Sequence, residues 1–294
     1  MMTAILQWTT ANPVRAFLAA GLAVFLPLPV AGALVVAALL ASGASAALAA
    51  AAGAAIATAL ASDSLFGSTM AAAIALLTVM PWVLGAFALE RSRSLSFAFQ
   101  ALTMGCCLLA LVANGLLGDP VSTLAPVIRK WADMLAGAGF PRVREEIGTV
   151  TAGISWGRLA WLVLIQAFIA LCAGLWVYGR GREPGLFGRE FRQLRLGGFP
   201  AWLLVVAFAT SVIGYRFAAD GWPAADDLVF VLAAAFLVQA LAVVHGLREL
   251  QVIGLLPVVL AYVAVLLVPM ALVGIGFADT WIRFRERFAP RQGE

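Results

Sequence analysis

Side chains that could do chemistry are scarce in this sequence. His245 is the only histidine among 294 residues, so a histidine-based metal site or a Ser-His-Asp arrangement has almost no residues from which it could be built. Cys106, Cys107 and Cys172 lie in apolar stretches without the spacing of a disulfide framework, and we interpret them as small buried hydrophobic residues. We therefore expect no catalytic residue, no metal site, no cofactor and no enzyme activity.

Nucleotide and nucleic-acid chemistry also lack their usual motifs. The sequence contains no Gly-x-x-x-x-Gly-Lys-Ser/Thr stretch, which excludes nucleotide hydrolysis through a P-loop. It has no ladder of basic and aromatic residues, so we do not expect it to bind nucleic acid.

The remaining candidates are polar side chains inside long apolar stretches: Gln100, Asn114, Gln166, Arg216, Gln239 and His245. In hydrocarbon an uncompensated polar group costs of order 1 kcal/mol or more, so such residues usually face a helix bundle or a cavity. We take Gln166, Gln239 and His245 as candidate ligand-binding residues. Gln239 and His245 are six residues apart, about 240° around a helix, so one ligand would need a wide or bent site.

Two of these residues have an alternative interpretation. Gln239 is equally well explained as a hydrogen-bonding contact between helices, since amides inside a membrane often bridge neighbouring helices. His245 lies close to Arg248 and Glu249, and the simpler interpretation is a histidine satisfied at the membrane interface. Ligand contact and structural contact both stay open for these side chains.

The composition identifies the environment of the chain. Hydrophobic residues make up 63% and charged residues 12% of it, and its mean hydropathy is +1.00. A soluble globule of this composition would lack the polar residues needed to cover its surface. The surrounding solvent must be lipid, where helices satisfy their own backbone. We predict an all-α integral membrane protein with a single transmembrane domain over residues 1–294.

Long apolar runs predict the membrane-spanning helices. No charge occurs between Ala16 and Ala61, and a continuous helix of that length would measure about 69 Å, more than twice the hydrocarbon thickness of about 30 Å. Pro27, Pro29 and Gly43 offer breaks, which leave either two spans or three short ones. Further runs occupy residues 69–89, 95–117, 158–178, 200–217, 228–246 and 252–277, so we predict a polytopic bundle of eight or nine spans.

Two polar connections interrupt these runs. Residues 119–157 carry charges and an apolar stripe at helical spacing around Arg129 and Lys130, which predicts an external amphipathic connection lying on the membrane interface. Residues 179–199 combine an apolar face, formed by Phe187, Phe191 and Leu194, with a basic one. We interpret this second connection as a cytoplasmic interfacial loop whose arginines anchor the topology and contact anionic lipid. These arginines are Arg180, Arg182, Arg189, Arg192 and Arg195.

The arginine-rich loop, residues 179–199, orients the chain because short arginine-rich loops stay in the cytoplasm. Counting back from it places residues 119–157 outside and, with three short spans before Asp63, the amino terminus and Arg15 inside. Counting forward over three spans would leave the polar tail, residues 279–294, outside with its arginines. Pro257 or Pro269 could divide the last run, or its end could re-enter the membrane, and we favour a cytoplasmic tail.

Small residues stand four apart in the first spans, as Ala16 with Ala20, Ala19 with Ala23, and Gly53 with Ala57. Such pairs let helices approach closely within lipid. They could pack inside the chain, or Ala16, Ala20 and Ala23 could form a docking surface for a partner helix.

Three segments carry a resemblance to a known family. They are Pro184-Gly-Leu-Phe-Gly-Arg-Glu-Phe-Arg-Gln-Leu-Arg-Leu196, Gln239-Ala-Leu-Ala-Val-Val-His245, and Gly276-Phe-Ala-Asp279 leading into Trp281-Ile-Arg-Phe-Arg285. Together with a Leu-Pro-Leu-Pro feature near the start, they resemble the YybS-like family of predicted multi-pass membrane proteins in its proteobacterial form, a domain of unknown function. The chain departs from that pattern at Ala240, where glycine is expected, and at Arg283, where an acidic residue is more typical.

That family looks distantly like the substrate-binding S components of energy-coupling-factor vitamin transporters. S components begin with short, irregular spans and dock on a transmembrane partner through Ala-x-x-x-Ala surfaces in the first span. The resemblance implies a multi-pass protein of the bacterial inner membrane, and it invites a comparison of Ala16, Ala20 and Ala23 with that docking surface.

Two functional hypotheses follow. In the first, the protein binds or helps to transport a small, amphipathic solute in a cavity lined by Gln166, Gln239 and His245, with any energy source in another chain. In the second, it is a non-transporting scaffold or assembly factor that docks on another membrane protein. The lipid bilayer is an expected partner in both, and another membrane protein subunit is expected in the second.

Overall fold

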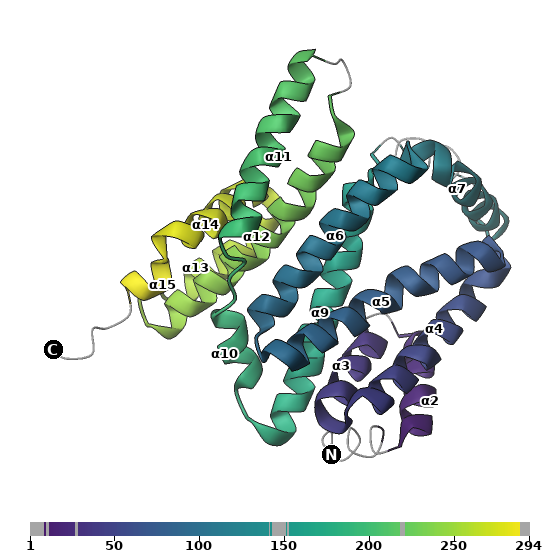
Figure 1. Ribbon diagram of the computed structural model, residues 1–294, viewed down its shortest axis with the longest axis horizontal. Helices are drawn as coiled ribbons and strands as arrows, with labels where there is room; N and C mark the ends of the chain where they lie inside the picture. The colour runs from purple at the N-terminus through teal and green to yellow at the C-terminus, as the bar shows by residue number, and fades with distance from the viewer. Residues whose placement is uncertain are drawn as a thin grey trace.

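The computed structural model describes residue 9 and residues 12–26, 29–140, 142, 151, 153–217 and 221–288. All regular structure in these ranges is helical, as the composition predicts. The helices, arranged as Figure 1 shows, are α2 (Pro13–Ala23), α3 (Val30–Ser42), α4 (Ala44–Phe66), α5 (Ser68–Ser92), α6 (Leu95–Leu117), α7 (Pro120–Gly137), α9 (Trp156–Arg182), α10 (Leu186–Arg192), α11 (Gly198–Phe217), α12 (Pro223–Glu249), α13 (Leu255–Leu267), α14 (Pro269–Ile282) and α15 (Phe284–Arg287).

Six helices in the described part of the chain are long and apolar enough to cross a membrane: α4, α5, α6, α9, α11 and α12. The pair α13 and α14 is a seventh candidate, but the two are bent by 119° where they meet. The chain is therefore an all-α membrane protein with six or seven candidate spans in that part. The expected eight or nine are not reached there, because α2 and α3 have only 11 and 13 residues, about 16 and 20 Å of helix.

The helix α3 covers only half the depth of the bundle. Its start faces the middle of α9, where Gly32 packs on Ala170. Its end lies at the end of α9, where the Arg182 guanidinium donates to the Ala41 carbonyl over 3.5 Å. The expected breaks at Pro29 and Gly43 immediately precede α3 and α4, while Pro27 lies outside the described residues.

The helix α2 runs in the same direction as α4. Ala16 lies near Ala50, and Gly21 lies near Ala57. Because α4 begins where α3 ends, α2 also begins at the face that carries the arginine-rich loop. The helices α2 and α3 thus form a short hairpin that enters the bundle from this face. Arg15 lies on the same side as the arginine-rich loop, as expected if basic residues gather on the cytoplasmic side.

Small residues let α2 pack closely on α4. A Cβ on Gly53 would lie 2.1 Å from the carbonyl oxygen of Phe17, so only glycine allows the two backbones to come this close. Ala16, Ala20 and Ala23 are 4%, 0% and 5% exposed. The helices that cover them are α3 and α4 of the same chain, which favours the alternative in which these alanines pack inside the chain over a docking surface for a partner helix.

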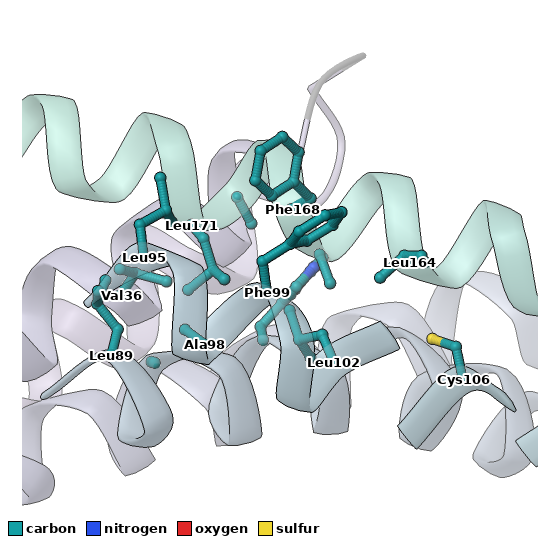
Figure 2. Close-up of a cluster of buried hydrophobic side chains, with 14 of the residues drawn as sticks. Val36, Leu89, Leu95, Ala98, Phe99, Leu102, Cys106, Leu164, Phe168 and Leu171 are labelled. Carbon is teal, nitrogen blue, oxygen red and sulfur yellow. The ribbon is translucent and has the colours of Figure 1, made fainter. Parts of the chain in front are cut away.

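Aromatic and small side chains hold α3, α5, α6 and α9 together. Figure 2 shows side chains of these helices meeting in one cluster, including Val36, Leu89 and Leu171. Phe99 of α6 and Phe168 of α9 have ring centroids 4.5 Å apart. This cluster fixes α9, which forms one wall of the cavity described below.

The amphipathic connection begins with α7, which lies across the ends of α4 and α6, away from α10 (Figure 1). Asp119 caps the helix by accepting the backbone N–H of Ser122 over 2.8 Å, and this bond lowers the pKa of Asp119. Ala132 is its buried residue, whereas Trp131 and Met134 are exposed. The interfacial position of this connection stays a prediction, which an exposed apolar face at the end of the bundle allows. Residues 143–150 lie outside the described part.

The helices α13 and α14 form a second short hairpin. The hairpin and α15, which follows it, contact the second half of α12, from Phe236, which packs on Phe277 of α14, to Gly246, which packs on Arg285 of α15. At the bend, residues 266–270 are all apolar, and Leu266 is 83% exposed. An exposed apolar bend is stable in hydrocarbon and costly in water, so we expect the bend to lie inside the membrane.

The second hairpin starts and ends at one face of the protein. Arg192 pairs with Glu249 just before α13, and Arg195 pairs with Glu286 just after α14. Residues 283–288 therefore lie on the side of the arginine-rich loop. Of the alternatives for residues 252–277, the one in which the run re-enters accounts for these contacts, and a cytoplasmic tail stays a prediction.

This geometry predicts which side of the membrane each segment faces. In a variant without the native cysteines, single cysteines replacing Arg189 and Arg287 are expected to react with a membrane-impermeant maleimide from one side, and a cysteine replacing Lys130 from the other. Labelling of oriented vesicles and of intact cells measures this directly. Labelling of the Arg189 and Arg287 positions from opposite sides would show that α13 and α14 cross the membrane.

Candidate ligand cavity

A cavity of about 690 Å³ lies between α9, α10, α12 and α13. The short helix α10 packs between α9 and α12 at one end of it (Figure 1). Small-ligand sites commonly have volumes of about 300–1,000 Å³, so the size is suitable. The α9 wall is apolar because residues at the spacing of one helical face point into the cavity: Ile165, Phe168, Ile169, Cys172 and Trp176.

Polar groups gather at the end of the cavity near the arginine-rich loop. His245 Nε2 lies 2.9 Å from the Tyr262 hydroxyl, a hydrogen bond that joins α12 to α13. Arg192 also lines the cavity and forms an ion pair with Glu249. A long apolar wall with hydrogen-bonding and charged groups at one end can bind an amphipathic molecule in a fixed orientation.

A smaller cavity of about 320 Å³ adjoins the first at Trp176 and Phe187, which line both. Arg180 lines the smaller one, and its guanidinium carbon lies 4.7 Å from the centroid of the Trp176 ring. This distance is typical of a cation–π contact. Arg180 and Arg192 thus flank one aromatic wall.

Of the three residues expected to bind a ligand, only His245 lines this cavity. Gln239 is 0% exposed. Its Oε1 accepts the backbone N–H of Leu196 over 2.8 Å, and its Nε2 donates to the Gly276 carbonyl over 2.8 Å. Gln166 donates to the Thr78 carbonyl over 3.4 Å. The structure therefore does not bring the three side chains together, and it supports the helix-bridging interpretation of Gln239.

Gln239 belongs to a buried polar network that fastens α14 and α15 to the arginine-rich loop. Asp279, which is 0% exposed, accepts a bond from the Arg285 guanidinium over 2.7 Å and from the Phe284 backbone N–H over 3.0 Å. Arg285 also donates to the carbonyl oxygens of Arg192 and Leu194. Burial lowers the pKa of Arg285 while the Asp279 carboxylate opposes this change, and the guanidinium stays charged at neutral pH.

The arginines of the loop have different contacts. Arg182 lies over the Tyr178 ring as well as bonding α3, and Arg189 pairs with Glu183. Arg195 donates to Glu286 over 2.5 Å, and this bond holds the pKa of Glu286 below its usual value. The loop thus joins α3, α9, α12 and α15 in addition to any contact with lipid.

Sequence reasoning missed Asp279 and Arg285 as partners, because the two residues are six apart in the sequence and lie in different helices, α14 and α15. Arg283 between them has a φ of 53°, in the left-handed region, and this turn is what brings the two side chains together. The sequence offered one signal, an acidic and a basic residue on either side of the end of a helix. It did not predict the turn between them, because arginine has no preference for the left-handed conformation that Arg283 adopts.

Among the described residues, no group of three or more His, Cys, Asp and Glu side chains could hold a metal ion. Comparisons of the chain with family models, curated proteins and solved structures found no match. Function therefore has to be inferred from the cavity and its surroundings.

Proposed function

We propose that this chain is a multi-pass protein of the bacterial inner membrane that binds, or helps to move, a small amphipathic solute in the cavity between α9, α10, α12 and α13. One observation carries the proposal: a single cavity of about 690 Å³ has an apolar wall, formed by α9, and a polar end, formed by His245, Tyr262 and Arg192. The protein has no enzyme activity in this proposal, and any energy for transport comes from another chain.

A second hollow in the protein lacks this combination. It measures about 430 Å³ and lies between α5, α6 and α9. Its lining is apolar apart from Cys106, so it offers nothing to orient a solute. The surface of α2 proposed for docking is covered by α3 and α4, which leaves the scaffold hypothesis without its site.

The resemblance to YybS-like proteins and, distantly, to S components is part of the same proposal. The short helices α2 and α3 are the counterpart of the short, irregular spans with which S components begin. An eight- or nine-span arrangement would require these helices and the α13–α14 pair to cross fully, and six spans with two half-depth hairpins fit the helix lengths better.

Filling the cavity tests the proposal. Ile169 is 41% exposed on the cavity wall, so Ile169→Trp should fill the cavity without disturbing buried packing. Leu162→Trp makes the same kind of change on α9 outside the cavity and is the matched control. We expect native mass spectrometry of protein released from its own membrane to show a bound amphiphile on the wild type and the control, reduced at least about fivefold on Ile169→Trp, a loss of roughly 1 kcal/mol. The proposal would be overturned if the two variants carried equal amounts of bound amphiphile, or if the wild type carried none.

A further inference from the structure

Guanidinium groups outnumber ion-paired carboxylates around the polar end of the cavity and the smaller cavity beside it. Arg192 lines the polar end, and Arg180 lines the smaller cavity, which adjoins the first at Trp176 and Phe187. Glu249 pairs with Arg192, and Glu183 pairs with Arg189. Among the described residues, the positive charge of Arg180 therefore has no ion-paired carboxylate.

Arg192 also has hydrogen-bonding capacity to spare. A guanidinium has five N–H donors in a planar fork, and Glu249 meets the Nε of Arg192. The side chain is 30% exposed, so its remaining donors can reach a second oxyanion at the cavity. Basic pockets between transmembrane helices at the cytoplasmic side are a recurrent means of binding acidic lipid headgroups.

The cavity opens sideways, towards the hydrocarbon. Ile169, Trp176 and Tyr262 line it and are 41%, 41% and 50% exposed. Ile169 and Trp176 belong to the half of α9 nearer the arginine-rich loop, and Tyr262 belongs to the half-depth hairpin. An occupant can therefore enter from the leaflet next to that loop, with its chain in the hydrocarbon and its head at the interface.

From these observations we infer that the solute is an anionic amphiphile, whose acidic head pairs with Arg192 and Arg180 and whose apolar chain lies along the α9 wall. This inference rests on the proposed function and specifies its ligand class. The same acidic head could belong to a free single-chain molecule or to an anionic phospholipid of the bilayer.

The test compares two probes that have the same chain. Dodecyl phosphate and neutral dodecanol are titrated against the full-length protein in a neutral detergent, and bound probe is counted by native mass spectrometry. We expect wild-type protein to bind dodecyl phosphate at least about tenfold more tightly than dodecanol, since a hydrogen bond to a charged group contributes about 1.5 kcal/mol or more. Arg192→Gln should lose most of this preference and keep its affinity for dodecanol.

Two variants control for charge and for folding. Arg189→Gln removes the same charge from the same short helix but leaves the cavity lining intact, so the preference should persist. Arg192→Lys keeps the charge and should keep much of the preference, which separates a lost head contact from a disturbed fold. Retained dodecanol binding in Arg192→Gln shows in addition that the cavity is still formed.

The outcomes separate failure of the ligand class from failure of the proposed function. If both probes bind equally to the wild type, and Ile169→Trp abolishes both, the cavity binds amphiphiles but the anionic class is wrong. If Ile169→Trp affects neither probe, the proposed function itself is wrong. Repeating the titration in phosphatidylcholine nanodiscs with and without phosphatidylglycerol identifies the source: competition by phosphatidylglycerol indicates a bilayer lipid, and its absence indicates a free single-chain anion.

Discussion

Asp279→Ala is expected to lower the free energy of unfolding by about 3 kcal/mol, because removing one partner of a buried ion pair leaves the other charge without compensation. Asp279 is 0% exposed, and Arg285, which donates to it over 2.7 Å, is 9% exposed. The variant would also free the backbone N–H of Phe284, whose bond to Asp279 stabilises the turn after α14. Unfolding in mixed micelles, followed by circular dichroism or by cysteine accessibility, measures the loss.

Glu286→Ala is the matched control for this prediction. It removes a carboxylate from the same cluster, but Glu286 is exposed, where an ion pair with Arg195 contributes little because water screens it. We expect its melting temperature to stay close to that of the wild type. Equal losses in the two variants would mean that the buried network does not hold α14 and α15 in place.

Gly276→Ala should destabilise the protein to a similar extent, by about 3 kcal/mol, at the upper end of what overpacking usually costs. A Cβ at this position would lie 1.9 Å from the carbonyl oxygen of Phe236 and 3.0 Å from the backbone nitrogen of Ala240. Both atoms belong to the backbone of α12, which cannot move aside as a flexible side chain can. The helix α14 would have to shift away from α12, and the Gln239 bond to the Gly276 carbonyl would lengthen.

Gly274→Ala provides the control, since it makes the same change two residues earlier on α14. No atom lies within 4 Å of a Cβ built there, and alanine favours a helix over glycine by about 1 kcal/mol. We expect this variant to be as stable as the wild type or slightly more stable. A Gly276→Ala protein that melts at the same temperature as Gly274→Ala would contradict the close approach of the two helices.

The Asp279–Arg285 ion pair and the close packing of Gly276 on α12 also affect the cavity. They fix α14 against α12 and thereby position α13, which contributes Tyr262 to the cavity wall. Loss of either contact should therefore lower the affinity for an amphiphile as well as the free energy of unfolding. The variants Ile169→Trp and Arg192→Gln act on the cavity itself, so their effects on binding can be separated from a loosened hairpin.

Part of the cavity could be predicted from the sequence. The helical spacing from Ile165 to Trp176 and the basic character of residues 179–199 are local patterns, and both are found at the cavity. His245 was identified because it is the only histidine in an apolar run. The role of Gln239 could not be assigned from the sequence, because a glutamine that bridges helices and one that binds a ligand have the same sequence context. Its hydrogen-bond partners, the Leu196 N–H and the Gly276 carbonyl, are known only from the structure.

Composition and helical periodicity by themselves determined that this protein is helical, lies in lipid and carries its arginine-rich loop on one side, because these properties depend on how many residues are apolar and how they repeat along the chain. Only the tertiary structure decided that residues 252–277 form two helices that turn back towards the arginine-rich loop. An apolar run of that length is equally compatible with a full span and with two half-depth helices. The choice depends on the bend of 119° between α13 and α14 and on the contacts of Gly276 and Arg285 with distant segments, which no local pattern encodes.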